Sequence, residues 1–131
     1  IETSGIKDKV HFLGRLPQQE VGNFLQKASV VVVPEQWENM APLIVTEAMA
    51  LSKPIVASKI GGIPELIIDK NTGMLSKHNS PEMFARKIVA ILKDKSLAKN
   101  LGKNAKKHFK SLFDEQKILK ALLNVYCSVR K

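Results

Sequence analysis

The sequence contains few of the residues that mark disulfide-rich, membrane-spanning or metal-binding proteins. Its single cysteine, Cys127, cannot form an internal disulfide, so we expect a cytosolic rather than a secreted protein. No run of about 18 apolar residues is present, so no segment of this sequence is expected to span a membrane. No two aspartates lie two residues apart and the three histidines are scattered. We therefore predict no metal site, and the sequence gives no reason to expect a cofactor.

The composition is that of one folded domain, since 44% of the residues are apolar and 25% are charged. The sequence opens on Ile1 and shows no targeting leader, so we expect it to be part of a longer protein.

The net charge of +9 is unevenly distributed. Residues 1–81 carry eight basic and eight acidic side chains, whereas residues 82–131 carry 13 basic and four acidic ones, which accounts for the whole excess. Such an asymmetry indicates an anionic partner, for which a membrane surface, nucleic acid and a phosphorylated ligand are the alternatives.

Short β-type segments alternate with helical patterns over the first 80 residues. We expect strands at 10–13 (VHFL), 30–33 (VVVV), 54–58 (PIVAS) and 73–76 (GMLS). The valine run has no polar alternation, so we expect a strand that is buried on both faces. Strands that alternate with helices predict an α/β fold, here a doubly wound, Rossmann-like parallel sheet.

Helices are expected to begin near Pro17, to cover 42–50, and to include a short one that ends near Ile68. From Ser80 onward everything is predicted to be helical, with Ser80 as a cap, further helices over 95–112 and 115–130, and Gly102 as a break in the helical pattern. The last helix carries an apolar stripe that we interpret mainly as core. It consists of Leu119, Leu122, Leu123 and Tyr126.

The segment after the valine run is the best candidate for a ligand site, because open parallel sheets bind ligands beyond the carboxyl ends of their strands. Residues 34–42 (PEQWENMAP) hold the only tryptophan and two carboxylates, and they lead into a helix N-terminus. Free amides at that N-terminus favour phosphate, while Glu47, one turn inside, can accept hydrogen bonds from hydroxyls. The pattern indicates a ligand that is part phosphate and part sugar, although a solvated Glu47 is the alternative.

The segment PEQWENMAPLIVTEAMALSKPIVASKIGGIPELIIDKNTGML is similar to the signature region of glycosyltransferase family 4, also called group 1. Those proteins show a glutamate in a strand-to-helix loop, a second one before Ala-Met-Ala, and then a Gly-Gly-x-Pro-Glu motif. The resemblance runs from about Val10 to the C-terminus. It implies the C-terminal, donor-binding half of a two-domain GT-B fold that transfers a sugar with retention.

The resemblance assigns roles to residues of this sequence. Glu47 matches the second glutamate, which contacts the ribose of the nucleotide, and Glu38 is the nearest match to the first, which faces the donor sugar. Eight residues separate Glu38 from Glu47 where the family has seven, so Asn39 takes the catalytic position if no bulge is present. Further donor-binding positions are Leu43, Ile44, Val45, Gly61 and Gly62.

The resemblance also implies partners and missing parts. The expected donor is a UDP- or GDP-sugar and the expected acceptor a glycan or a lipid-linked molecule. The family's Arg and Lys that hold the diphosphate, and its N-terminal acceptor domain, have no match here, so we expect the chain alone to be inactive. A sugar-nucleotide epimerase and a non-catalytic polyanion-binding module are the alternatives.

Four lysines recur at helical spacing in the basic last third and predict a basic stripe. They are Lys103, Lys106, Lys107 and Lys110. A solvated helix face is one interpretation, and peripheral contact with an anionic membrane at its inner face is the other. Only Phe109 interleaves with these lysines, so we expect no nucleic acid.

Overall fold

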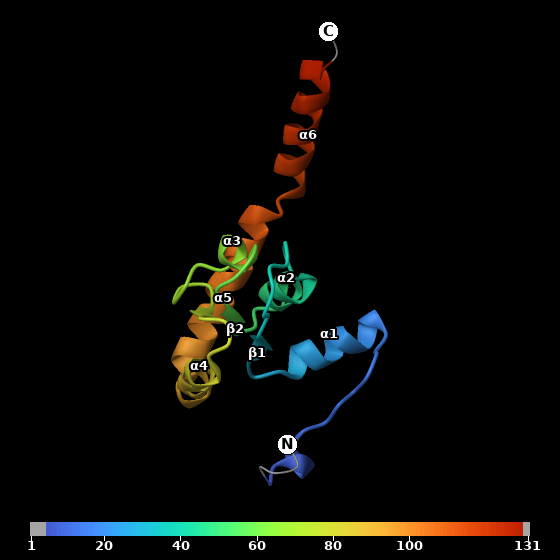
Figure 1. Ribbon diagram of the computed structural model, residues 1–131. Coiled ribbons are helices and arrows are strands. Elements are labelled where there is room, and N and C mark those ends of the chain that lie inside the picture. The colour runs from blue at the N-terminus through green and yellow to red at the C-terminus, as the bar shows by residue number, and fades with distance from the viewer. Residues whose placement is uncertain (1–4, 130–131) are drawn as a thin grey trace.

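The computed structural model describes residues 5–129 and has a three-stranded parallel sheet at its centre (Figure 1). The strands are β1 (Val31–Val33), β2 (Ile55–Ser58) and β3 (Met74–Ser76), in the order β1-β2-β3. Their register places Val32 beside Val56, and Val56 beside Met74. Each strand is followed by helical structure, as parallel neighbours require.

The helices lie before, between and after these strands. Their bounds are η2 (Lys7–Lys9), α1 (Gln18–Lys27), α2 (Leu43–Ala50), α3 (Ile63–Leu66), α4 (Pro81–Lys93), α5 (Lys95–Leu112) and α6 (Glu115–Val129). α5 begins where the Asp94 carboxylate accepts a hydrogen bond from the Leu97 amide at 2.9 Å, which satisfies one of the free donors of its first turn.

Both faces of the sheet are covered, which confirms the doubly wound arrangement. Ile55 and Ala57 of β2 belong to a core shared with α2 and α3, whereas Val56 points to the opposite face. There it packs with Phe84 and Ile91 of α4, and α5 contributes to both sides. The alternation along one strand thus fills two apolar layers.

α5 packs directly against the end of α2, and Gly102 makes this contact possible. A Cβ atom at Gly102 would lie 2.0 Å from the backbone oxygen of Ser52, far inside the contact distance. The prediction that Gly102 breaks the helical pattern is therefore wrong, since it lies inside α5, which has the predicted bounds. Its missing side chain lets the two backbones meet.

Two predictions about strands are also wrong. Residues 10–13 form no strand, and Phe12 is 84% exposed, because no strand of the described residues lies beside this segment to pair with it. Val32 in the middle of β1 is 38% exposed, so β1 is buried on one face rather than on both.

Two predictions about helices differ as well. Ser80 occupies the N-cap position of α4, but its side chain makes no capping hydrogen bond. The apolar stripe of α6 is not core, since no residue of α6 is buried. Figure 1 shows that α6 extends away from the sheet.

Candidate functional site

A cavity of about 420 Å³ lies beyond the carboxyl ends of β1 and β2. Its lining comes from the loop after β1 and from the turn and short helix after β2: Glu38, Asn39, Met40, Gly61, Gly62 and Glu65. Two segments that are more than 20 residues apart in the sequence are joined there because adjacent parallel strands end at the same edge of the sheet.

Two hydrogen bonds fix the loop after β1 to the end of β2. The buried hydroxyl of Ser58, at the last position of β2, donates to the carbonyl of Glu35 at 2.7 Å. Further along, the amide of Gly62 donates to the carbonyl of Asn39 at 2.9 Å. The loop after β1 is thus held at Glu35 by the last residue of β2, and at Asn39 by a residue of the turn that follows β2.

The backbone of this loop occupies the space that side chains at Gly61 and Gly62 would need. A Cβ atom at Gly61, whose φ is +55°, would lie 2.3 Å from the Asn39 carbonyl oxygen. At Gly62 it would lie 1.4 Å from the carbonyl oxygen of Met40. Only glycine lets the two backbones approach this closely, so the pair sets the shape of the cavity.

Glu38 and Asn39 both line the cavity, so the two alternatives for the catalytic position lie within one site. Both residues are exposed. Glu65 joins them from α3, also exposed, and none of the hydrogen bonds or ion pairs of the described residues engages its carboxylate. Free carboxylates facing a cavity can accept hydrogen bonds from ligand hydroxyls.

The N-terminus of α2 follows the same loop. The amide of Val45 donates to the carbonyl of Pro42 at 3.0 Å and is therefore already used within the first turn. No backbone hydrogen bond of the described residues uses the amides of Leu43 or Ile44. Of the three predicted amides, these two remain as free donors at the positive end of the helix.

Glu47 lies in the second turn of α2, where it is half-buried. It does not line the cavity at the strand ends, so the structure places it beside the candidate site rather than within it. The resemblance assigns no role to Ser58 or to Glu65, which is the last residue of the Gly-Gly-x-Pro-Glu motif at residues 61–65. The motif itself was the signal that could have placed Glu65 at the cavity.

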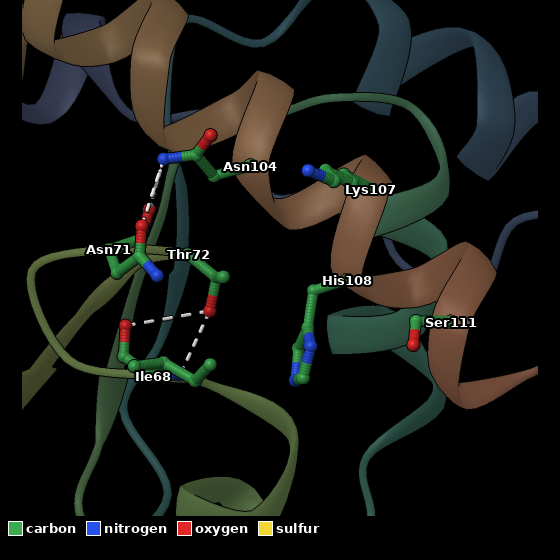
Figure 2. A pocket seen from close by; sticks show the side chains of 7 residues that line it. All are labelled: Ile68, Asn71, Thr72, Asn104, Lys107, His108 and Ser111. Carbon is green, nitrogen blue, oxygen red and sulfur yellow. Dashed lines mark hydrogen bonds between the residues drawn. The ribbon is translucent and has the colours of Figure 1, made fainter.

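A second cavity, of about 390 Å³, lies near the opposite edge of the sheet, between α5 and the loop before β3. Figure 2 shows Asn104 of α5 facing Asn71, whose side-chain oxygen accepts its hydrogen bond at 2.9 Å. Beside them Thr72 accepts a hydrogen bond from the Ile68 amide at 2.8 Å, and His108 descends from α5. The Nε2 atom of His108 is buried without a hydrogen-bond partner. These contacts tie α5 to the loop and include none of the predicted donor-binding residues.

The predicted lysine stripe lies on the solvent side of α5. With Lys99 added, five lysines form what we call the α5 lysine face: Lys99, Lys103, Lys106, Lys107 and Lys110, all exposed. Together with Ser52 they line a hollow of about 580 Å³. Ser52 precedes β2, whereas Gly61 and Gly62 follow it, so this hollow and the candidate site lie toward opposite edges of the sheet.

Comparison with known families gives a match over most of the chain. The family described as "Glycosyl transferases group 1" matches residues 1–108. The chain belongs to the group 1 glycosyltransferases. The loop after β1, the start of α2 and the glycine pair all lie inside the matched range.

An individual relative and a solved structure support this assignment. An uncharacterized glycosyltransferase of Methanocaldococcus jannaschii is 35% identical over 117 residues, which cover 89% of this chain and 33% of the relative. The sucrose-phosphate synthase structure from Thermosynechococcus elongatus has a TM-score of 0.87 at 29% identity, over 98% of this chain and 32% of that one. The chain thus spans about a third of the length of the proteins it matches.

The fold is also shared with Anabaena HepE, whose structure was determined in complex with UDP-glucose. The TM-score is 0.85 at 23% identity, covering 97% of this chain and 34% of HepE. Among residues 5–129, no helix has the length and apolar character needed to cross a membrane.

Proposed function

We propose that this group 1 glycosyltransferase chain supplies the donor site of an enzyme that transfers a hexose, with retention, from a UDP- or GDP-sugar to a glycan or lipid-linked acceptor. The observation that carries the proposal is the cavity at the ends of β1 and β2, with carboxylates on its walls and free helix amides close to it in the chain. The HepE complex with UDP-glucose supports a nucleotide-sugar ligand for this fold.

The chemistry of the cavity suits a nucleotide-sugar. Glu38 and Glu65 lie on its wall and can accept hydrogen bonds from sugar hydroxyls. The amides of Leu43 and Ile44 lie at the positive end of α2, where phosphate oxygens are stabilised. Because a carboxylate beside a phosphate would repel it, the sugar belongs toward the glutamates and the diphosphate toward the helix.

Within this proposal Glu38 faces the donor sugar and supports the positive charge that develops at the anomeric carbon as the diphosphate leaves. If the loop aligns without a bulge, Asn39 takes that position and offers a dipole in place of a charge. Retention follows if the acceptor attacks from the face that the diphosphate leaves. Glu47, half-buried one turn into α2, is proposed to contact the ribose.

We also expect that sugar transfer requires residues and a domain in addition to this chain. The Arg and Lys that hold the diphosphate in similar proteins have no match here, and the acceptor domain is expected on a separate segment. The chain is therefore expected to bind the donor weakly and to show no transfer by itself.

Ligand-observed NMR of this chain against UDP-, GDP- and ADP-sugars tests the donor site. We expect saturation transfer to one nucleotide class, with weaker signals for Glu65→Gln and Glu47→Gln. Loss of one charge-assisted hydrogen bond corresponds to roughly tenfold weaker binding. Glu20→Gln, which removes an exposed glutamate of α1, is the matched control and should bind as the parent does.

Two results would contradict the assignment. Equal loss of signal in Glu20→Gln would attribute the effect to net charge rather than to the cavity. Binding that is unchanged in both Glu65→Gln and Glu47→Gln would remove the sugar and ribose contacts from the proposal. Retention is tested separately on a polypeptide that also carries the acceptor domain, since the anomeric coupling constant of the product distinguishes the two stereochemical outcomes.

A further inference from the structure

We propose that the α5 lysine face is a docking surface for an anionic phospholipid bilayer. This inference does not rest on the donor-site assignment, because the face and the candidate site lie toward opposite edges of the sheet. Three features of the face support a bilayer as its partner: its density of positive charge, the lack of neutralising carboxylates among residues 5–129, and its length along α5.

The charge of α5 is of one sign. Its 18 residues include six lysines and no aspartate or glutamate. Five of these lysines occupy positions 99, 103, 106, 107 and 110, which a period of 3.6 residues places on one side of the helix. The opposite side carries Leu101 and Ala105, which are buried in the core, so the lysines point toward solvent.

No carboxylate neutralises this face among residues 5–129. The two acidic residues that flank α5 are engaged elsewhere, since Asp94 caps the helix through the Leu97 amide. Asp114 lies 3.7 Å from Lys117 in an ion pair of its own. None of the five lysines takes part in an ion pair with a described residue. The positive potential of the face is therefore available to an outside partner.

The shape of the face suits an extended anionic surface. The lysines between positions 99 and 110 span about 16 Å along one side of α5, so their long side chains can reach one plane. Phe109 is turned inward, where it packs against the core and lies 4.9 Å from the ring of Phe113. The face thus offers no aromatic platform on which bases could stack, which argues against single-stranded nucleic acid.

Vesicle sedimentation with this chain tests the proposal. Vesicles of equal parts phosphatidylglycerol and phosphatidylcholine are expected to bind the chain, whereas pure phosphatidylcholine vesicles are not. Each lysine near an anionic bilayer contributes about fivefold to partitioning. Binding is expected to fall as salt is raised from about 0.1 M to about 1 M, because the screening length shortens from about 10 Å to about 3 Å.

The decisive comparison uses two variants of equal charge. The first replaces four residues of the face, Lys99→Gln, Lys103→Gln, Lys106→Gln and Lys110→Gln, and leaves Lys107 because it also lines the second cavity. The control replaces four exposed lysines elsewhere, Lys27→Gln, Lys77→Gln, Lys93→Gln and Lys120→Gln. Both have a net charge of +5, which is +9 less four.

We expect the face variant to lose roughly 600-fold in vesicle affinity, which is about fivefold for each of four lysines, while the control loses much less. Circular dichroism of both variants checks that each is folded. Equal losses in the two variants would show that net charge alone attracts the protein to the bilayer and would overturn the proposal. Failure of the parent chain to bind the phosphatidylglycerol vesicles would overturn it as well.

Discussion

Helices α2 and α6 are both rich in apolar side chains, yet α2 is packed inside the fold and α6 is exposed. In α2, Val45, Ala48 and Met49 are completely buried between the sheet and α5. In α6, Leu122 is 50% exposed and Tyr126 is 68% exposed. The comparison shows that an apolar stripe indicates which side of a helix is buried, whereas the fold decides whether a partner is present.

The largest expected difference comes from truncating one side chain on each helix. Met49→Ala should lower the free energy of unfolding by about 2–5 kcal/mol, because it leaves a cavity among buried residues. Leu122→Ala should change it by less than about 0.5 kcal/mol, since the side chain is half exposed in the folded chain. Urea unfolding followed by circular dichroism measures both values. Similar losses would show that α6 is packed in solution, which would contradict the difference in burial between α2 and α6.

A second prediction concerns the contact that buries α2 against α5. Gly102→Ala should destabilise the chain by about 1–3 kcal/mol, because the added Cβ meets the Ser52 backbone, which cannot rotate away as a side chain would. This loss should appear even though alanine favours helix over glycine by about 1 kcal/mol.

Gly22→Ala provides the matched control for that change. Gly22 lies inside α1, and a Cβ atom there meets nothing within 4 Å. This variant should gain about 0.5–1 kcal/mol from helix propensity alone. A gain of the same size in Gly102→Ala would contradict the close approach of α5 to α2.

A third prediction concerns Gly62, in the turn between β2 and α3. Gly62→Ala would place a Cβ 1.4 Å from the Met40 carbonyl oxygen, so the exposed loop has to move. Because the loop is on the surface, the stability loss should be about 1 kcal/mol or less. The same NMR panel should nevertheless report roughly tenfold weaker donor binding, equivalent to about 1.4 kcal/mol. Unchanged donor binding would show that the loop geometry does not shape the donor site.

The local sequence patterns predicted most of the elements. The β-branched runs at 30–33 and 54–58 and the Pro-initiated helices were placed within one or two residues of their observed bounds. The resemblance in residues 34–75 led to the family that comparison then confirmed. These features are local, because strand periodicity, helix periodicity and the glycine pair can each be recognised within a short stretch of sequence.

The incorrect predictions concern contacts between elements rather than the elements themselves. Residues 10–13 have the composition of a strand but lack a neighbour to pair with, and Gly102 resembles a helix break but is a packing site. Val32 and the α6 stripe are apolar and remain exposed. Each of these outcomes depends on a partner distant in the sequence, which no local pattern specifies.

The sequence by itself determined the order of strands and helices, the parallel α/β class and the concentration of positive charge in the last third, since these depend on residue type and spacing. The tertiary structure alone decided that Glu65 and Asn39 line one cavity, that Ser58 holds the loop at Glu35, and that Gly102 meets Ser52. Those juxtapositions arise when the ends of neighbouring parallel strands meet at one edge and helices cross over them, which is a property of the packed chain.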